Sequence, residues 1–275
     1  MHDHTTGSTL TADAIFAVPF VLALILYLSG VVIQIQCARP WPWHRTVTWV
    51  LGVVAAASGF VGPLAEAAHD DFVAHMGAHL LVGMVAPLLL VAAAPMTLAL
   101  RTLHVTRGRR LSRLLTGRPA RFVTSPVVAG VLNVGGVWLL YSTPLFQAMQ
   151  ADVLVHLVVM THFLVAGYLF TVAIVPIDPA PHRARYVTRM VVLVVVLAAH
   201  SILAKTIYAH PPDGVDIESA RAGAMLMYYG GDLVDLVLVT VLCAQWYRDT
   251  GRRLRRAVDS PRSEFGADAG ETRRR

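Results

Sequence analysis

Long apolar runs separated by short polar connections occupy most of the chain. As α-helices, runs of this length cross about 30 Å of hydrocarbon. Neither a basic segment nor a small-residue cleavage site marks the first run as a removable leader, so we expect it to remain a helix. The pattern predicts an all-α, polytopic membrane protein with seven transmembrane helices in a domain over residues 1–246. The predicted spans are 15–36, 46–62, 72–100, 123–141, 152–175, 187–208 and 223–246.

The composition excludes a soluble globular domain of this length. Of the 275 residues, 56% are hydrophobic and only 15% are charged, whereas soluble domains carry about 25% charged residues. The formal net charge is +6, but arginines between apolar runs are better explained by membrane topology than by nucleic-acid binding. We therefore expect a multi-pass protein of the plasma membrane, with the lipid bilayer and no nucleic acid as a partner.

The positive charges predict the orientation of the helices. All but two of the 23 Lys and Arg residues lie on one side, the exceptions being Lys205 and Arg221. Because cytoplasmic loops are enriched in these residues, the N-terminus is predicted to be outside and the C-terminus in the cytoplasm. The Arg-rich, polar segment 247–275 is predicted to be a disordered cytoplasmic tail. Cys37 and Cys243 show neither disulfide nor zinc-ligand spacing.

Histidines concentrate in the outer half of the predicted bundle, which holds nine of the 12. His75 and His79 are four residues apart and share one helix face, so both can contact one ion. At about 1.5 Å per residue, four polar groups from four helices are expected in one layer, about 10–15 Å below the outer surface. The members of this layer are His79, His162, His200 and Asp232.

These side chains form a candidate metal site. Imidazoles with a carboxylate or a nearby thioether suit copper or zinc, and His156 lies near enough to ligate the ion or to support a ligand. In the competing interpretation they are hydrogen-bonded core residues, which is the commoner role of a single membrane histidine. The candidate metal ligands are His75, His79, His156, His162, His200 and Asp232.

Two further patterns affect the shape of this site. Pro87 and Pro95 fall within the third predicted helix, where proline kinks a helix or ends it early. The seventh helix carries a stripe of soft or acidic residues at spacings of three and four, and carboxylates in such a position face a partner or water. The stripe consists of Met225, Tyr228, Asp232 and Asp235.

Three stretches carry a resemblance to a known family. They are His75–Met76–Gly77–Ala78–His79 with Pro87 and Pro95 downstream, His156 to His162 with Met160, and Gly230–Gly231–Asp232 after His200. Together they resemble the polytopic cytochrome c oxidase assembly factor CtaG, the multi-helix family linked to caa-type oxidases. The resemblance covers roughly residues 60–246. The single prolines and alanines stand where the family has a double proline and a glycine, which changes the expected shape of the kink.

The resemblance implies an integral membrane assembly factor for a haem-copper oxidase, without enzymatic chemistry of its own, that binds or delivers copper at the outer face. Its partner would be an oxidase subunit or another copper-handling protein. In this hypothesis His75 and His79 capture the ion near the mouth. The deeper ligands are His162, His200 and Asp232, with His156 beside them.

Two other functions fit the same residues. Paired histidines from different helices can be axial haem ligands, in a membrane electron carrier or a haem-modifying enzyme. The stripe that reaches Asp235 can instead form the upper part of a copper permease, although the inner half offers only Cys37 and Cys243 as soft ligands. A retinal-type receptor is excluded, because the single lysine, Lys205, lies near the end of the sixth predicted helix.

Overall fold

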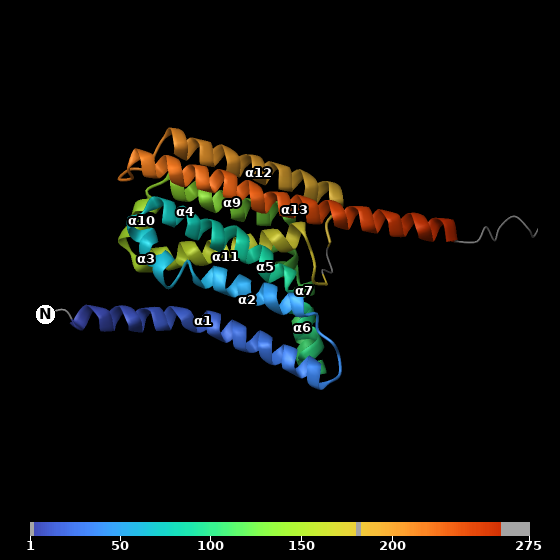
Figure 1. Ribbon diagram of the computed structural model, residues 1–275. Coiled ribbons are helices and arrows are strands. Elements are labelled where there is room, and N and C mark those ends of the chain that lie inside the picture. The colour runs from blue at the N-terminus through green and yellow to red at the C-terminus, as the bar shows by residue number, and fades with distance from the viewer. Residues whose placement is uncertain (1–2, 180–182, 260–275) are drawn as a thin grey trace, which may run out of the picture.

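The protein is a bundle of roughly aligned helices (Figure 1). The structure, a computed structural model, describes residues 3–179 and 183–259. Those residues contain helices and connections but no strand, so the predicted all-α class is confirmed. The long helices are α1 (Asp3–Gln36), α2 (Trp43–Ala57), α9 (Pro126–Ser142), α11 (Val153–Ile174), α12 (Tyr186–Ala209) and α13 (Ile217–Asp259).

The lengths of the helices indicate five or six membrane spans among the described residues. Within the described ranges, five segments are long and apolar enough to cross a membrane: α11, α12, the apolar part of α1, the unit Phe72–Ala92, and most of α13. A sixth is reached if α9 and α10 (Leu145–Ala151), which meet at 82°, form one span. Helix α2 has 15 residues, short for a full crossing. The seven-span topology therefore stays a prediction.

Helix α13 is longer than the sequence pattern indicated. The apolar pattern placed its end at residue 246, but the helix continues to Asp259 and projects beyond the bundle (Figure 1). Arginine is a good helix former, so the helix can continue after the apolar pattern stops. Residues 247–259 are thus helical in the structure. Residues 260–275, the rest of the tail predicted to be disordered, lie outside the described residues.

The third predicted helix is broken in two places, each near a proline. Helix α4 (Phe72–Leu80) passes through a π-helical turn, η1 (Leu81–Val85), into α5 (Ala86–Ala92). Pro87 has no N–H to donate to the carbonyl four residues earlier, which favours this widened turn. The helix then ends before Pro95, where Ala94 takes a left-handed conformation with φ 51°. The expected early end is confirmed, whereas at Pro87 the helix continues through the π-helical turn as one span from Phe72 to Ala92.

Asp178 stabilises the start of the helix that follows this break. Its carboxylate accepts hydrogen bonds from the backbone N–H groups of Met96 (3.1 Å) and Thr97 (2.7 Å), and from the Thr97 hydroxyl (2.6 Å). These atoms lie in the first turn of α6 (Pro95–Thr102). A carboxylate there satisfies N–H groups that have no partner within the helix and favours the helix dipole.

The remaining helices close the two ends of the bundle. They are α3 (Pro63–Asp70), α7 (Val105–Thr116) and α8 (Arg118–Val123). Helix α4 packs on α13, whereas η1 and α5 pack on α11 and α2. Helices α9 and α12 pack on each other, α9 also contacts α11, and α12 contacts α13. The broken unit α4–η1–α5 is therefore surrounded by other helices.

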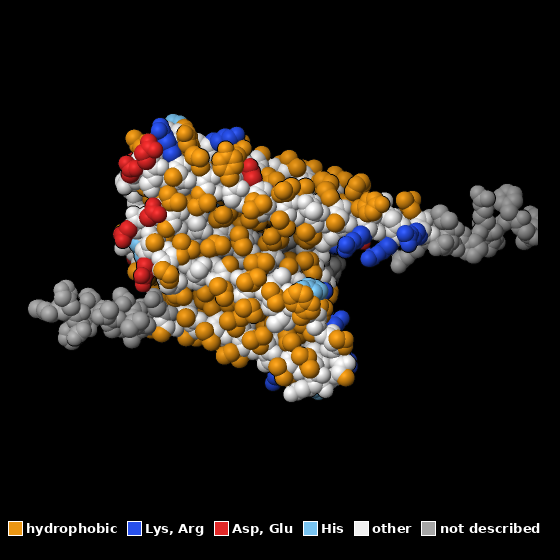
Figure 2. Space-filling model, in the orientation of Figure 1, with side chains coloured by type: hydrophobic (Ala, Val, Ile, Leu, Met, Phe, Trp, Pro, Cys, Tyr) orange, Lys and Arg blue, Asp and Glu red, His pale blue; other side chains and the backbone are white. Residues whose placement is uncertain are grey.

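The two ends of the molecule differ in charge. Figure 2 shows Asp and Glu side chains at the end that holds α3 and the start of α13, and Lys and Arg mainly towards the opposite end. Hydrophobic side chains cover the surface between them, as expected of a membrane-embedded protein. We call these the acidic end and the arginine end. The exposed acidic residues of the acidic end are Glu66, Asp70, Asp71, Asp152, Asp213, Asp216 and Glu218.

Among the described residues, two apolar clusters lie one above the other in the centre of the bundle, and a third, of Tyr27, Trp41, Ala93 and Leu98, lies between α1 and α6. The cluster near the acidic end includes Phe72, Met76 and Phe163. The cluster near the arginine end includes Phe170 and Leu238. Polar side chains meet between them.

Candidate metal centre

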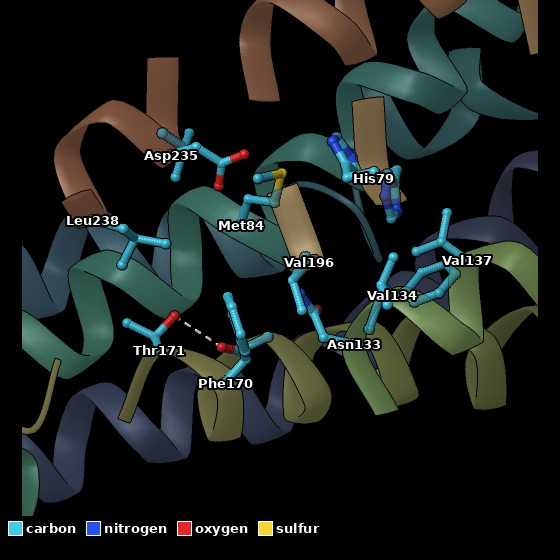
Figure 3. A pocket seen from close by; sticks show the side chains of 15 residues that line it. His79, Met84, Asn133, Val134, Val137, Phe170, Thr171, Val196, Asp235 and Leu238 are labelled. Atoms are coloured by element: carbon cyan, nitrogen blue, oxygen red, sulfur yellow. Dashed lines mark hydrogen bonds between the residues drawn. The ribbon is translucent and has the colours of Figure 1, made fainter. Parts of the chain in front are cut away.

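A small cavity lies between the two apolar clusters. Its volume is about 30 Å³, enough for one or two water molecules or a single ion. Five helical segments and η1 line it, and Figure 3 shows labelled side chains converging on it from different helices. The lining residues that carry polar atoms or sulfur are His79, Met84, Asn133, Thr171, His200 and Asp235.

Two histidines in this cavity each carry a buried ring nitrogen that has no hydrogen-bond partner among the described residues. His79 from α4 is 4% exposed and His200 from α12 is 8% exposed. Among the described residues, neither Nδ1 of His79 nor Nε2 of His200 has a partner, although both atoms are fully buried. Leaving such a group unpaired costs about 1–3 kcal/mol. A buried polar atom of this kind requires a partner, which a water molecule or an ion can supply.

The backbone around the cavity is shaped to hold these rings. Gly231 of α13 lies against His200, where a Cβ would come within 2.7 Å of the imidazole Cε1 atom. Gly167 of α11 lies against η1, where a Cβ would overlap the carbonyl oxygen of Gly83. Glycine at these two positions lets α13 approach α12 at His200 and lets α11 approach η1 closely.

Asp235 occupies the position that the sequence pattern assigned to Asp232. Asp235 is 6% exposed and lines the cavity, and within the described chain it forms no ion pair. Asp232 is exposed on the outward side of α13, although its charge is close enough to act on His200. Three residues turn a helix by about 300°, which leaves the two side chains about 60° apart, and the rotation of α13 in the bundle buries Asp235 while Asp232 lies at the exposed edge of the same stripe.

His75 lies nearer the acidic end, inside a group of aromatic rings. It is 5% exposed, and its Nε2 atom is 3.2 Å from the hydroxyl of Tyr141. The ring stacks on Phe72 and meets Phe146 edge-on at 5.3 Å. His75 and His79 share the inner side of α4, as their spacing predicted. Only His79 reaches the cavity.

The other two predicted ligands lie elsewhere. His162 turns towards α9, where its Nε2 atom is 3.1 Å from the backbone carbonyl oxygen of Leu132. His156 is half-buried at the acidic end, and its ring centroid is 5.1 Å from that of His69. The six predicted ligands are therefore divided between the cavity, the aromatic group, the α9 contact and the protein surface.

The arrangement limits the chemistry of the cavity. In the described part of the chain, no three His, Cys, Asp or Glu side chains are placed to hold a metal ion together. The two imidazoles therefore offer an ion fewer ligands than a closed site of four ligands would. A haem would require a far larger space than about 30 Å³. Towards the arginine end, Phe170, Val196 and Leu238 join the apolar cluster and close the cavity floor.

Sequence comparison identifies the family. Residues 25–249 match the family described as cytochrome c oxidase caa3 assembly factor. The chain belongs to this family. The suspected resemblance is thereby confirmed, and the matched range includes every residue that lines the cavity.

Several relatives of this family member are known from mycobacteria. Uncharacterized proteins of Mycobacterium bovis and Mycobacterium tuberculosis are each 29% identical to it over 277 residues, which is 93% of this chain and 42% of theirs. An uncharacterized protein of Mycobacterium leprae is 28% identical over 261 residues, or 87% of this chain and 40% of its own. The chain thus spans about two fifths of the length of these relatives. No solved structure matches it.

Some residues of this caa3 assembly factor family member were not assigned to the site from sequence. Met84 and Asn133 line the cavity, and Asp235 replaces Asp232. For Asp235, the periodicity of buried positions in α13 could have indicated its inward direction. The buried positions of α13 recur at helical spacing through Met227, Val234 and Leu238, which places residue 235 near the inward side and residue 232 away from it.

Proposed function

We propose that this chain takes part in the maturation of a caa3-type cytochrome c oxidase by holding a copper ion in the cavity between His79 and His200. One observation carries the proposal: two buried imidazoles from different helices face the same ion-sized cavity with unsatisfied ring nitrogens. A bound ion would remove the free-energy cost of burying them. The family description supports the role in oxidase assembly.

The donor set favours copper over hard cations. Imidazole nitrogen suits copper and zinc, and a thioether such as that of Met84 selects Cu(I). Magnesium and calcium require several oxygen ligands instead. Asp235 would supply negative charge beside the ion. Two imidazoles hold copper less tightly than a closed four-ligand site, which suits a protein that must release its cargo.

The proposed topology places the site near its source of copper. With seven spans and the arginine end in the cytoplasm, the acidic end faces the outside of the plasma membrane. The separation of charge in Figure 2 supports this orientation. Copper would then enter at the acidic end and be transferred to an oxidase subunit or another copper-handling protein. The closed floor of the cavity favours holding over transport through the membrane.

Complementation of a deletion strain tests the proposal. We expect wild-type protein to restore oxidase activity in isolated membranes, and the double variant His79→Ala/His200→Ala to leave it low unless copper is added in excess. His104→Ala is the matched control, because His104 is exposed at the arginine end. Full activity of the double variant at normal copper concentration would overturn the copper-holding role. Full oxidase activity in the deletion strain itself would overturn the assembly role.

A further inference from the structure

Two histidines meet on the surface of the acidic end, outside the cavity. His69 is exposed near the end of α3, and His156 is half-buried in the first turn of α11. Their ring centroids are 5.1 Å apart and the ring planes are inclined by 48°. Neither ring forms a hydrogen bond to a described residue, so both keep nitrogen atoms for a ligand.

The separation of the rings fits shared coordination of one ion. An imidazole nitrogen binds copper or zinc at about 2.0–2.1 Å, and the ring centroid lies about 1.1 Å behind that nitrogen. At a tetrahedral angle, two such rings have centroids about 5 Å apart. The observed 5.1 Å matches this value. Water can complete the coordination, as at open metal sites.

The backbone beside each histidine is held by a helix cap. Asp71, two residues after His69, donates its backbone N–H to the Ala67 carbonyl at the end of α3 (2.8 Å), and its carboxylate accepts two backbone N–H bonds at the start of α4, at 3.1 and 3.0 Å. Asp152 precedes His156 and accepts an N–H bond of 2.7 Å at the start of α11. These caps fix the two turns that carry the imidazoles. The backbone that carries the two rings therefore needs little ordering when a metal binds, which favours affinity.

The surroundings of the two rings attract cations, and further donor atoms lie near them. The exposed carboxylates of the acidic end raise the local cation concentration. His75 lies within electrostatic range of both His69 and His156, and His79 within range of His75. Met76, next to His75, is fully buried with its sulfur 3.6 Å from the Tyr141 hydroxyl. The nitrogen donors of His75 and His79 and the sulfur donor of Met76 thus lie below the surface pair, on the buried side.

We propose that His69 and His156 form a surface capture site for a copper or zinc cation, which is supplied inward to His75 and His79 in the oxidation state in which it is captured. Capture itself needs only the two surface imidazoles. The inward supply rests on the function proposed above. Capture involves no change of oxidation state, because the ion exchanges water ligands for imidazole nitrogens.

Copper titration of the purified full-length protein in lipid nanodiscs tests the capture site. We expect the electron paramagnetic resonance spectrum of added Cu²⁺ to show coupling to two nitrogens at about one equivalent. His69→Ala/His156→Ala should lose this signal and weaken Cu²⁺ binding at least tenfold. His210→Ala is the control, since His210 is an exposed histidine on the same side of the predicted topology. Unchanged Cu²⁺ binding by the double variant would overturn the proposal.

The same titration separates this proposal from the cavity. His79→Ala/His200→Ala should keep the two-nitrogen Cu²⁺ signal, because the surface pair is intact. If that variant loses the signal while His69→Ala/His156→Ala retains it, the surface site is refuted and the cavity is the Cu²⁺ site. Failure of the cavity variant to lower oxidase activity would refute the copper-holding function and leave the surface site in place. His69 is exposed, so its replacement does not disturb the core.

Discussion

The close approach of Gly231 to His200 leads to a sharp prediction. In Gly231→Ala, the new Cβ would lie 2.7 Å from Cε1 and 3.1 Å from Nδ1 of the imidazole. Since carbon atoms pack at about 3.5–4.0 Å, the ring must move by about 0.8 Å or more. Ligands of a functional site must stay within about 0.5 Å of their working positions. We expect the affinity for Cu(I) to fall about 10- to 100-fold, or by about 1.4–2.7 kcal/mol.

The effect on folding should be small by comparison. Alanine in place of glycine within a helix contributes about 1 kcal/mol of stability, which offsets much of the about 1–3 kcal/mol that overpacking costs. Gly230→Ala is the matched control, because its Cβ would meet the flexible end of Leu80 at 2.5 Å and no imidazole. Competition with a chromogenic Cu(I) chelator measures the affinity, and thermal unfolding measures stability. Wild-type affinity in a folded Gly231→Ala protein, or an equal loss in Gly230→Ala, would refute the reasoning.

Three further predictions distinguish the structure from the sequence pattern. His162→Ala should change Cu(I) affinity less than threefold where His79→Ala lowers it at least tenfold, because the His162 ring bonds a backbone carbonyl outside the cavity; equal losses in chelator competition would contradict this. Asp235→Asn should lower Cu(I) affinity about tenfold, since it removes the charge lining the cavity; unchanged affinity would exclude the carboxylate. Asp178→Ala should destabilise the protein by about 2 kcal/mol through loss of the α6 cap, seen as a lower unfolding temperature than in the control Asp213→Ala.

Periodicity and proline chemistry predicted most of the fold. The helix of residues 153–174 was predicted within a residue or two at each end, because its apolar run stops at polar or turn residues. The break at Pro95 followed from the missing N–H of proline. The end of α13 did not follow from apolar pattern, since arginines after residue 246 continue a helix as well as apolar residues do.

The sequence predicted how deep in the bundle each site residue lies, but not towards which neighbouring helix its side chain points. His79 and His200 meet in the cavity because they lie at the same depth and on helix faces that point towards each other. His162 has the expected depth but points to α9, and the packing that sets its rotation is not encoded in one helix alone. His69 was not selected because its contact with His156 depends on the turn at Asp71, which separates α3 from α4. Spacing along a chain determines a face only within one helix.

Copper content of the purified protein tests the central proposal most directly. Wild-type protein from copper-replete cells, washed with a mild chelator, should retain about one copper per chain by elemental analysis. His79→Ala/His200→Ala, prepared in the same way, should retain a small fraction of that amount. Copper in the wild type no higher than in the double variant would contradict the account.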